Sequence, residues 1–296
     1  MSKEQHSWDA DNLPGKHMAT RGDASTKKDA GACLNRHHGR RNRVTGFLTK
    51  SSCNHRWQAF RRALDEDKVK YNWPAYESIV DHVQKTQGGK TRRTIDLLSR
   101  TGKKIKRNRV PSKDAPLWDI TAGGKNFQTR CTRPYWHEAH HIVPNGELQG
   151  AIAEAGENES LAPEYIGLIR AGLLDKKYNL NHMENMIILP MAKEVAYALG
   201  LPRHRVSAGE RSHSAYSHQV RMELDKIFKP IQQSVKAHAD PPPDYNACKK
   251  AIEALSGSFR DQIEAAGKAM KASEKWEDNA LEDMWKDQDQ DSNAPI

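Results

Sequence analysis

The sequence predicts a predominantly helical α+β protein with one small pair of β-strands, a disordered basic N-terminus and an acidic C-terminal tail. Apolar residues spaced by three or four positions predict long amphipathic helices around residues 216–231 and 252–263. A short apolar run at residues 185–190 predicts a buried strand that ends at a proline. Residues 1–55 are polar and lack periodicity, which is typical of a disordered chain.

The N-terminal half contains two further predicted regions. Trp57, Phe60 and Leu64 lie at i, i+3 and i+7, and later apolar groups extend a helical prediction to about residue 100. We therefore expect a helical region at 56–115. The basic run at 103–113 within it is predicted to be a linker or an exposed loop.

Local patterns in residues 116–240 predict a series of short elements. They are strands pairing at 117–121 and 126–132, helices at 146–156 and 163–174, a strand at 185–190 and a helix at 192–199. Pro163 is well placed to begin a helix, and Gly200 to end one. Residues 241–296 are predicted to hold a last helix and an acidic tail. We expect this tail to be solvated, and the alternative is that it folds over a basic groove or binds a basic partner.

The charge balance favours an acidic polymer as partner. The chain has 47 Lys and Arg against 38 Asp and Glu, a formal net charge of +9. Nucleic acid is the first candidate and an anionic membrane the second. Residues 30–64 contain basic but no acidic side chains, which suits phosphate binding, although a solvated tail could have the same composition.

Cysteine usage and apolar content indicate where the chain folds. Cys33, Cys53, Cys131 and Cys248 form no CxxC pair, so we expect folding in a reducing cytosol without a disulfide framework. No stretch has the length and apolar content of a secretory signal or a membrane span. Export would therefore need a route that reads no cleavable signal.

Several potential metal ligands lie near the N-terminus. These are Cys33, His37, His38, Cys53 and His55. Their spacings match no standard pairing of close zinc ligands, so a zinc site here stays an alternative to a plain polar segment.

The run at residues 136–144, Trp-His-Glu-Ala-His-His-Ile-Val-Pro, is the most informative in the chain. Neighbouring side chains diverge on a strand or a helix, so His140 and His141 cannot both enter an apolar core. One ring could bind a metal while the other takes a proton, and a His-rich polar turn is the alternative. Further candidate groups follow downstream: Asn185, His204, His213, Tyr216 and His218. Metal-assisted phosphodiester cleavage needs this combination of ligands and a free base.

These residues resemble the His-Asn-His and endonuclease VII (His-Me finger) superfamily of nucleases. Residues 139–144, Ala-His-His-Ile-Val-Pro, are similar to its AHH toxin-nuclease subgroup. Residues 185–190 resemble its Asn followed by apolar residues and Leu-Pro, residues 201–204 its Leu-Pro-x-His step, and residues 212–216 its His-x-x-Tyr closure. The resemblance covers about residues 125–235. It implies a nuclease domain at 116–240, with a ββα-metal core of hairpin and helix wrapped by further helices.

The resemblance also implies a role for each motif residue. His140, His204 and His213 would bind one divalent metal ion, with Mg²⁺ or Zn²⁺ favoured over Mn²⁺ or Ni²⁺. His141 would be the general base, and Asn185 would hold the hairpin through hydrogen bonds to its backbone. Tyr216 would orient a ligand or touch phosphate. The relatives' two closing histidines lie closer together than here, so His218 is an alternative third ligand to His204.

The activity that the resemblance implies is metal-dependent hydrolysis of phosphodiester bonds, with DNA favoured over RNA. The subgroup implies an antibacterial toxin effector, made in a bacterial cytoplasm and delivered into the cytoplasm of a competitor by type VI secretion or a similar system. Its expected partners are a cognate immunity protein and a secretion adaptor or carrier protein, with no membrane. The alternatives are a phage or housekeeping nuclease, and a zinc-stabilised nucleic-acid-binding protein without catalysis.

Overall fold

A computed structural model describes most of the chain from residue 18 to residue 285. The described residues are 18–19, 31–37, 41–65, 70–71, 94–98, 104–109, 120, 124–131, 133–157, 162–205, 213–237, 243–273 and 280–285. The fold is α+β and predominantly helical, as the sequence predicts.

A two-stranded antiparallel sheet lies at the centre of the described structure. Strand β3 (His137–His141) pairs with β4 (Met186–Pro190), and His140 lies opposite Ile187. All five residues of β4 are buried. The two strands of the expected metal-site hairpin therefore pair, but helices α4 (Asn145–Ala155) and α5 (Ala162–Asp175) lie between them in the chain.

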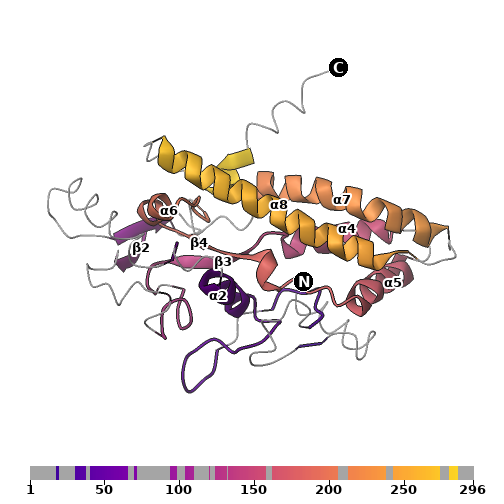
Figure 1. Cartoon of the computed structure of the whole chain (residues 1–296), viewed down its shortest axis with the longest axis horizontal. Helices are drawn as coiled ribbons and strands as arrows, with labels where there is room; N and C mark the ends of the chain where they lie inside the picture. Colours follow the sequence, from indigo (N-terminus) through magenta and orange to yellow (C-terminus); the bar gives the residue numbers. More distant parts are fainter. Residues whose placement is uncertain are drawn as a thin grey trace.

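Helices cover this sheet (Figure 1). Helix α2 (His55–Asp65) packs against β3 and β4, and α6 (Lys193–Leu199) follows β4 and ends at Gly200 in the left-handed region, with a φ of 61°. The long helices α7 (Ser214–Lys236) and α8 (Tyr245–Ala272) lie side by side, and α4 packs against α7. The amphipathic patterns thus predicted both long helices correctly.

Three local predictions are wrong. Residues 94–98 and 104–109, expected as helix and as linker or exposed loop, are strands β1 (Thr94–Leu98) and β2 (Lys104–Arg109) of a second antiparallel pair. Ile95 and Leu97 alternate with other residues, which is the strand period, but the helical pattern before them was continued too far. Residues 126–129 form a turn and not the expected strand at 126–132. The next strand in the chain is β3, which begins at His137.

The N-terminal segment is more ordered than its composition predicts. Residues 31–37 and 41–54 pack on the fold, and the side chains of Ala32, Cys33 and Leu34 are fully buried. The expectation of disorder is wrong for these residues, while the rest of residues 1–55 lies outside the described structure apart from residues 18–19 and His55. One cluster of buried apolar residues runs from Ala32 to Leu281, so the N-terminal segment shares the core of the helices.

The C-terminal segment also departs from its prediction. The short 3₁₀ helix η4 (Leu281–Trp285) packs against α7, and both Leu281 and Glu282 are buried. A solvated tail is therefore wrong for this part, whereas residues 274–279 and 286–296 lie outside the described structure.

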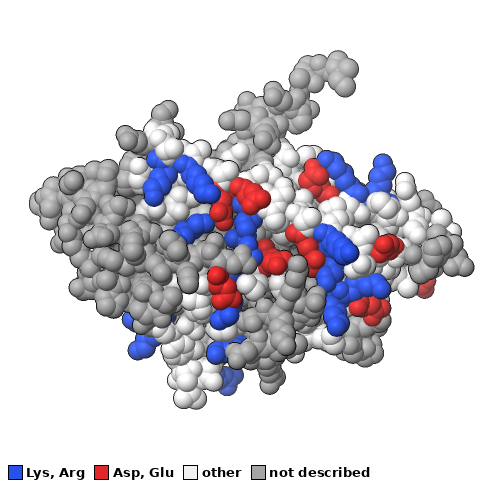
Figure 2. Space-filling view, viewed as in Figure 1, with Lys and Arg blue, Asp and Glu red and all other residues white. Residues whose placement is uncertain are grey.

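The described helices and surface limit what the net charge can say about the protein's partner. None of these helices is both long and apolar enough to cross a lipid bilayer. Figure 2 shows one face, on which Lys and Arg lie among Asp and Glu instead of forming one separate basic patch. Among the described residues, Lys70 and Glu264 form an ion pair, 3.3 Å apart. The net charge alone therefore does not mark a binding surface on the described part of this face.

Candidate metal centre

Three histidines from distant parts of the chain meet beside the central sheet. His140 Nδ1 lies 3.1 Å from His204 Nε2, which lies 3.3 Å from His213 Nε2. One ligand atom from each of the three residues can be chosen so that all lie within 4.8 Å of one another. Each of the three residues is about 7% exposed. The resemblance named the same three residues.

Different elements position the three rings. His140 is held in β3, and His213 directly precedes α7. His204 lies after α6, where its backbone N–H donates to the Pro190 carbonyl at 2.8 Å. This bond ties the loop after α6 to the end of β4, and it brings the His204 ring to within 5.1 Å of the His140 ring, centroid to centroid.

Burial keeps the cluster uncharged. Burial is the largest cause that lowers the pKa of His140 well below its ordinary value, and repulsion from His204 and His213 adds to it. Burial also lowers the pKa of His204, and it lowers the pKa of His213 to about 3. Neutral imidazoles carry the lone pairs that bind a metal. One proton between two ring nitrogens could satisfy a single pair, whereas a cation can satisfy three converging nitrogens at once.

Carboxylates lie behind two of the rings. Glu138 Oε2 is 3.2 Å from His204 Nδ1, and Glu282 Oε2 is 3.4 Å from His213 Nδ1. Burial disfavours the charged form of Glu138, but His204 and Arg205 outweigh this and lower its pKa to about 2. Carboxylates on the outer nitrogens of ligating histidines fix the ring orientation and raise the basicity of the ligands. The described residues therefore fit a divalent transition metal in both their donors and their supporting groups.

His141 points to a different partner from His140. Its Nε2 lies 3.0 Å from Asn181 Oδ1. Asn181 Nδ2 donates to the Asn35 carbonyl at 2.8 Å, which fixes the orientation of the amide, so His141 Nε2 must be the donor. The lone pair then lies on His141 Nδ1. Burial lowers the pKa of His141 to about 4, so the ring is neutral at neutral pH.

Asn185 makes the backbone hydrogen bonds that the resemblance implies for it. Its Oδ1 accepts from the Val143 N–H at 2.7 Å, and its Nδ2 donates to the carbonyls of Val143 and Leu180. The Ser256 hydroxyl of α8 donates to the same Oδ1 at 2.9 Å. Asn185 therefore fixes the chain just after His141 to the start of β4 and to α8.

A cavity of about 600 Å³ opens beside these histidines. His140, His141, His204 and His213 all line it. Arg36 and Arg205 also line it, as does the first turn of α4, which has no side-chain cap. Helix N-termini and arginines favour anions, so the cavity combines neutral metal donors with groups that suit phosphate.

A comparison with protein families decides which class of domain carries this geometry. Residues 122–243 match the AHH family, described as a nuclease family of the HNH/ENDO VII superfamily with conserved AHH. The chain carries an AHH-family nuclease domain. Ala139, His140 and His141 lie inside the matched residues. No curated protein and no solved structure matches the chain.

The structure bears on two expectations from the sequence, the role of Tyr216 and the choice between His204 and His218 as a metal ligand. Tyr216 is fully buried and its hydroxyl donates to the Ile142 carbonyl, so it does not touch phosphate. Its ring lies 5.4 Å from the His140 ring, which it supports. His218 is exposed on α7 and lies outside the described histidine cluster, whereas His204 lies within it.

Four residues that line the cavity or contact its histidines were not predicted from the sequence. They are Arg36, Asn181, Arg205 and Glu282. The signals in the sequence were the basic composition around Arg36 and the acidic stretch that contains Glu282. Glu138, which belongs to the run at residues 136–144, lies half-buried between His204 and Arg205.

Proposed function

We propose that this AHH nuclease is a metal-dependent endonuclease that hydrolyses phosphodiester bonds, with DNA as its substrate. One observation carries the proposal: three neutral histidines converge in a cavity that also exposes a fourth histidine with a defined tautomer. Metal binding and proton transfer are thereby separated between adjacent side chains of one strand.

His141 is the general base of the proposed reaction. Its Nδ1 takes a proton from the attacking water as the new O–P bond forms and the bond to the leaving O3′ breaks. Asn181 holds Nε2–H and so keeps the lone pair on Nδ1. The His55 ring, 5.2 Å from the His141 ring, packs against the base.

His140, His204 and His213 are the proposed metal ligands. A divalent cation held there would supply positive charge for the phosphate oxygens and the leaving oxygen. Imidazole donors suit Zn²⁺ and Ni²⁺, whereas Mg²⁺ and Mn²⁺ prefer oxygen ligands, which the substrate phosphate would supply. Glu138 and Glu282 orient two of these rings from outside.

Arg36 and the start of α4 are the proposed phosphate contacts. Arg36 is exposed at the cavity, and its backbone N–H donates to Asn145 Oδ1 at 3.0 Å, which fixes it beside the first turn of the helix. Arg205 is engaged by Glu138 at 2.6 Å, so its charge is partly compensated. Arg36 is therefore the stronger candidate for binding the substrate.

The biological role that we propose is that of an antibacterial effector, delivered by type VI secretion or a similar system into the cytoplasm of a competitor. This role follows from the resemblance of the AHH motif to toxin nucleases. A cognate immunity protein and a secretion adaptor or carrier are the proposed partners. An acidic face on the immunity protein would complement Arg36 at the cavity.

Cleavage of supercoiled plasmid and of structured RNA tests the activity. Wild-type protein with added metal should cut DNA, and a chelator should abolish cutting. His141→Ala should reduce the rate about 10²- to 10⁴-fold, the usual contribution of a general base, while the histidine cluster still binds metal. His218→Ala, at an exposed position, is the matched control and should cut normally. Intact DNA and RNA under all conditions would refute the nuclease assignment.

Expression in a bacterial cytoplasm tests the effector role separately. Wild type should arrest growth, His141→Ala should not, and the immunity protein should restore growth when it is co-expressed. Harmless expression of a protein that cuts DNA in vitro would reject the effector role and leave the nuclease in place.

A further inference from the structure

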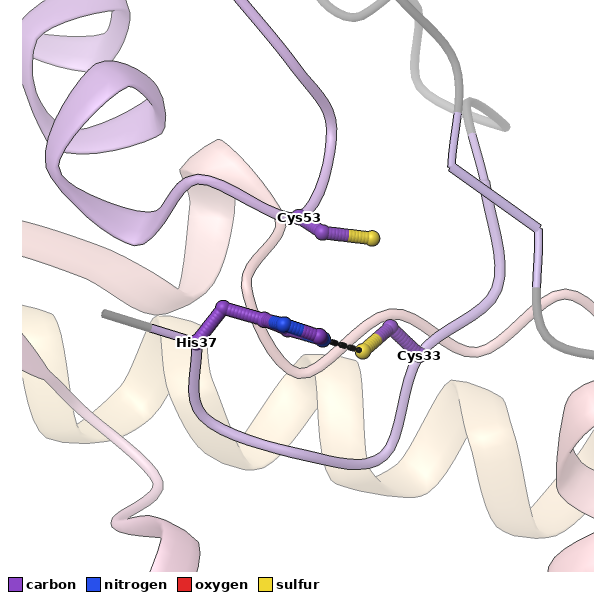
Figure 3. A group of neighbouring side chains, drawn as sticks. All are labelled: Cys33, His37 and Cys53. Carbon is purple, nitrogen blue, oxygen red and sulfur yellow. Dashed lines mark hydrogen bonds between the residues drawn. The ribbon is translucent and has the colours of Figure 1, made fainter. Parts of the chain in front are cut away.

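A second group of potential ligands lies outside the proposed active site. Cys33 Sγ lies 3.0 Å from His37 Nε2, and these atoms and Cys53 Sγ are all within 4.8 Å of one another (Figure 3). Cys33 and Cys53 are buried, and His37 is half-buried. The three side chains come from two segments, residues 31–37 and the turn before α2.

We propose that Cys33, His37 and Cys53 bind a structural Zn²⁺ ion. Zinc–sulfur bonds of about 2.3 Å and zinc–nitrogen bonds of about 2.0 Å place tetrahedral ligand atoms roughly 3.5 to 3.8 Å apart, which the spacing in the cluster allows. Two thiolates and an imidazole are the donors that zinc takes in structural sites. The described residues supply three donors, so water or another group completes the shell.

A plain hydrogen-bonded core without an ion is the main alternative. Cys33 Sγ lies 3.3 Å from the Asn35 carbonyl as well as 3.0 Å from His37 Nε2. Without a metal, the Cys33 thiol would donate to the Asn35 carbonyl, and His37 Nε2–H would donate to the sulfur, which is a weak acceptor. Cys33 and Cys53 form no disulfide in the structure. A metal-bound thiolate would replace the His37 contact with a coordination bond.

The segment that carries Cys33 also supports the proposed general base, His141. The Cys33 backbone pairs with residues 178–180, donating to the Tyr178 carbonyl at 2.9 Å and accepting from the Leu180 N–H at 2.8 Å. Two residues after Cys33, the Asn35 carbonyl accepts from Asn181, which holds His141. The segment that carries two of the zinc ligands therefore also supports the amide that sets the tautomer of His141.

Cys53 also links the proposed zinc site to His141, through His55. It lies two residues before His55, whose ring packs on His141 and whose Nδ1 contacts the His37 carbonyl. An ion bound by Cys33, His37 and Cys53 would fasten both supports of His141 to each other. The sequence offered these ligands among five candidates, of which His55 lies outside the cluster and His38 outside the described residues.

Metal content of the purified full-length protein tests the site. Zinc would be counted in wild type, in a histidine variant, His140→Ala/His213→Ala, and in a cysteine variant that carries Cys33→Ser/Cys53→Ser in addition to those two histidine changes. The histidine changes keep zinc out of the proposed active site, and Cys131→Ser is the cysteine control outside the cluster. The histidine variant should keep one tightly bound zinc per chain, and the cysteine variant should lose it. Absence of zinc from the histidine variant, or its retention in the cysteine variant, would overturn the proposal.

Cobalt exchange separates the two sites by their optical spectra. Co²⁺ bound by thiolates shows a sulfur-to-cobalt charge-transfer band in the near ultraviolet, which a site of histidines alone lacks. The band should appear in wild type and in the histidine variant and be absent from the cysteine variant. A cobalt-loaded wild type without the band would exclude thiolate ligation.

Measurements on unsubstituted protein cover the case in which the cysteine variant fails to fold. A mercurial thiol reagent should release the tightly bound zinc from wild type in step with modification of two cysteines. Alkylation and mass spectrometry without reductant should find no Cys33–Cys53 disulfide. Modification of the thiols without zinc release, or recovery of that disulfide, would reject the site while leaving the proposed nuclease activity untouched.

Discussion

His141 Nε2 lies 3.0 Å from Asn181 Oδ1, across 40 positions of sequence. Because Asn181 Nδ2 is engaged by the Asn35 carbonyl, this contact determines which nitrogen of His141 carries the proton. A residue that touches neither metal nor substrate thus decides whether the proposed base is available.

Substitution of Asn181 should therefore change the pH profile as well as the rate. Asn181→Asp places a negative charge beside His141 and stabilises the imidazolium, so the pKa of His141 should rise. The acidic limb of kcat/KM should move to higher pH, and Asn181→Ala should lower kcat about 10- to 100-fold without such a shift. Nuclease rates from pH 4 to 9 measure both effects. An unchanged profile in Asn181→Asp would show that the contact does not govern the base.

Glu282 should tune metal affinity from outside the histidine cluster. It lies 3.4 Å from His213 Nδ1, and removal of such a supporting carboxylate typically weakens metal binding about 10- to 100-fold. We expect Glu282→Gln to show this loss in calorimetric titration with Mn²⁺ or Zn²⁺. Glu154→Gln, which changes a half-exposed partner of Arg221, should bind metal as wild type does. Equal affinities in the two variants would contradict the supporting role.

Asn185 should matter for folding as much as for activity. Its side chain makes four buried hydrogen bonds, to Val143 twice, to Leu180 and to Ser256. Asn185→Ala leaves several of these groups unpaired, at about 1 to 3 kcal/mol for each buried group. Urea unfolding monitored by circular dichroism should show a loss of at least about 2 kcal/mol. The matched change Asn246→Ala, at an exposed position on α8, should cost far less.

The sequence predicted the parts of this site that depend on local pattern. The amphipathic spacing located α7 and α8, and the motifs around His140, His204 and His213 identified the residues that meet. It missed partners that lie far apart in the chain. Asn35 and Asn181 are 146 positions apart, and Glu282 follows His213 after both long helices, so no periodicity links either pair.

For the same reason, average composition wrongly predicted that two segments are exposed to solvent. Residues 1–55 are polar and basic on average, yet Ala32, Cys33 and Leu34 are fully buried because the backbone of Cys33 pairs with residues 178–180. Glu282 lies in an acidic stretch, yet it is buried against His213. Average charge describes a segment in water, whereas burial depends on the specific partner that the fold provides.

Acid should destabilise the metal-free protein in a defined pH window. His137 is buried and its Nδ1 donates to the Tyr135 carbonyl at 2.9 Å, and burial lowers its pKa from 6.5 to about 3. The unfolded chain therefore binds the proton first as pH falls. Stability should be constant above about pH 6.5 and fall between 6.5 and 3, by about 1.4 kcal/mol per pH unit for each such histidine.

Paired substitutions check this acid effect. Urea midpoints with a chelator present, at pH 7 and pH 4.5, should show a weaker pH dependence for His137→Gln than for wild type. His218→Gln removes an exposed histidine and should leave the dependence as in wild type. The explanation fails if His137→Gln and His218→Gln have the same slope of stability against pH.

Arg36 should contribute to substrate binding through charge. It is exposed and lines the cavity with His140 and His141, and one phosphate contact contributes about one unit to the slope of log affinity against log salt. In a His141→Ala background, Arg36→Ala should weaken binding of a short DNA duplex, measured by fluorescence anisotropy, and reduce that slope by about 1. Arg61→Ala is the control, because Arg61 pairs with Asp65 at 2.9 Å on α2 and does not line the cavity. If Arg36→Ala and Arg61→Ala bind DNA alike at every salt concentration, the substrate phosphate does not rest on Arg36, and Arg205 becomes the next residue to substitute.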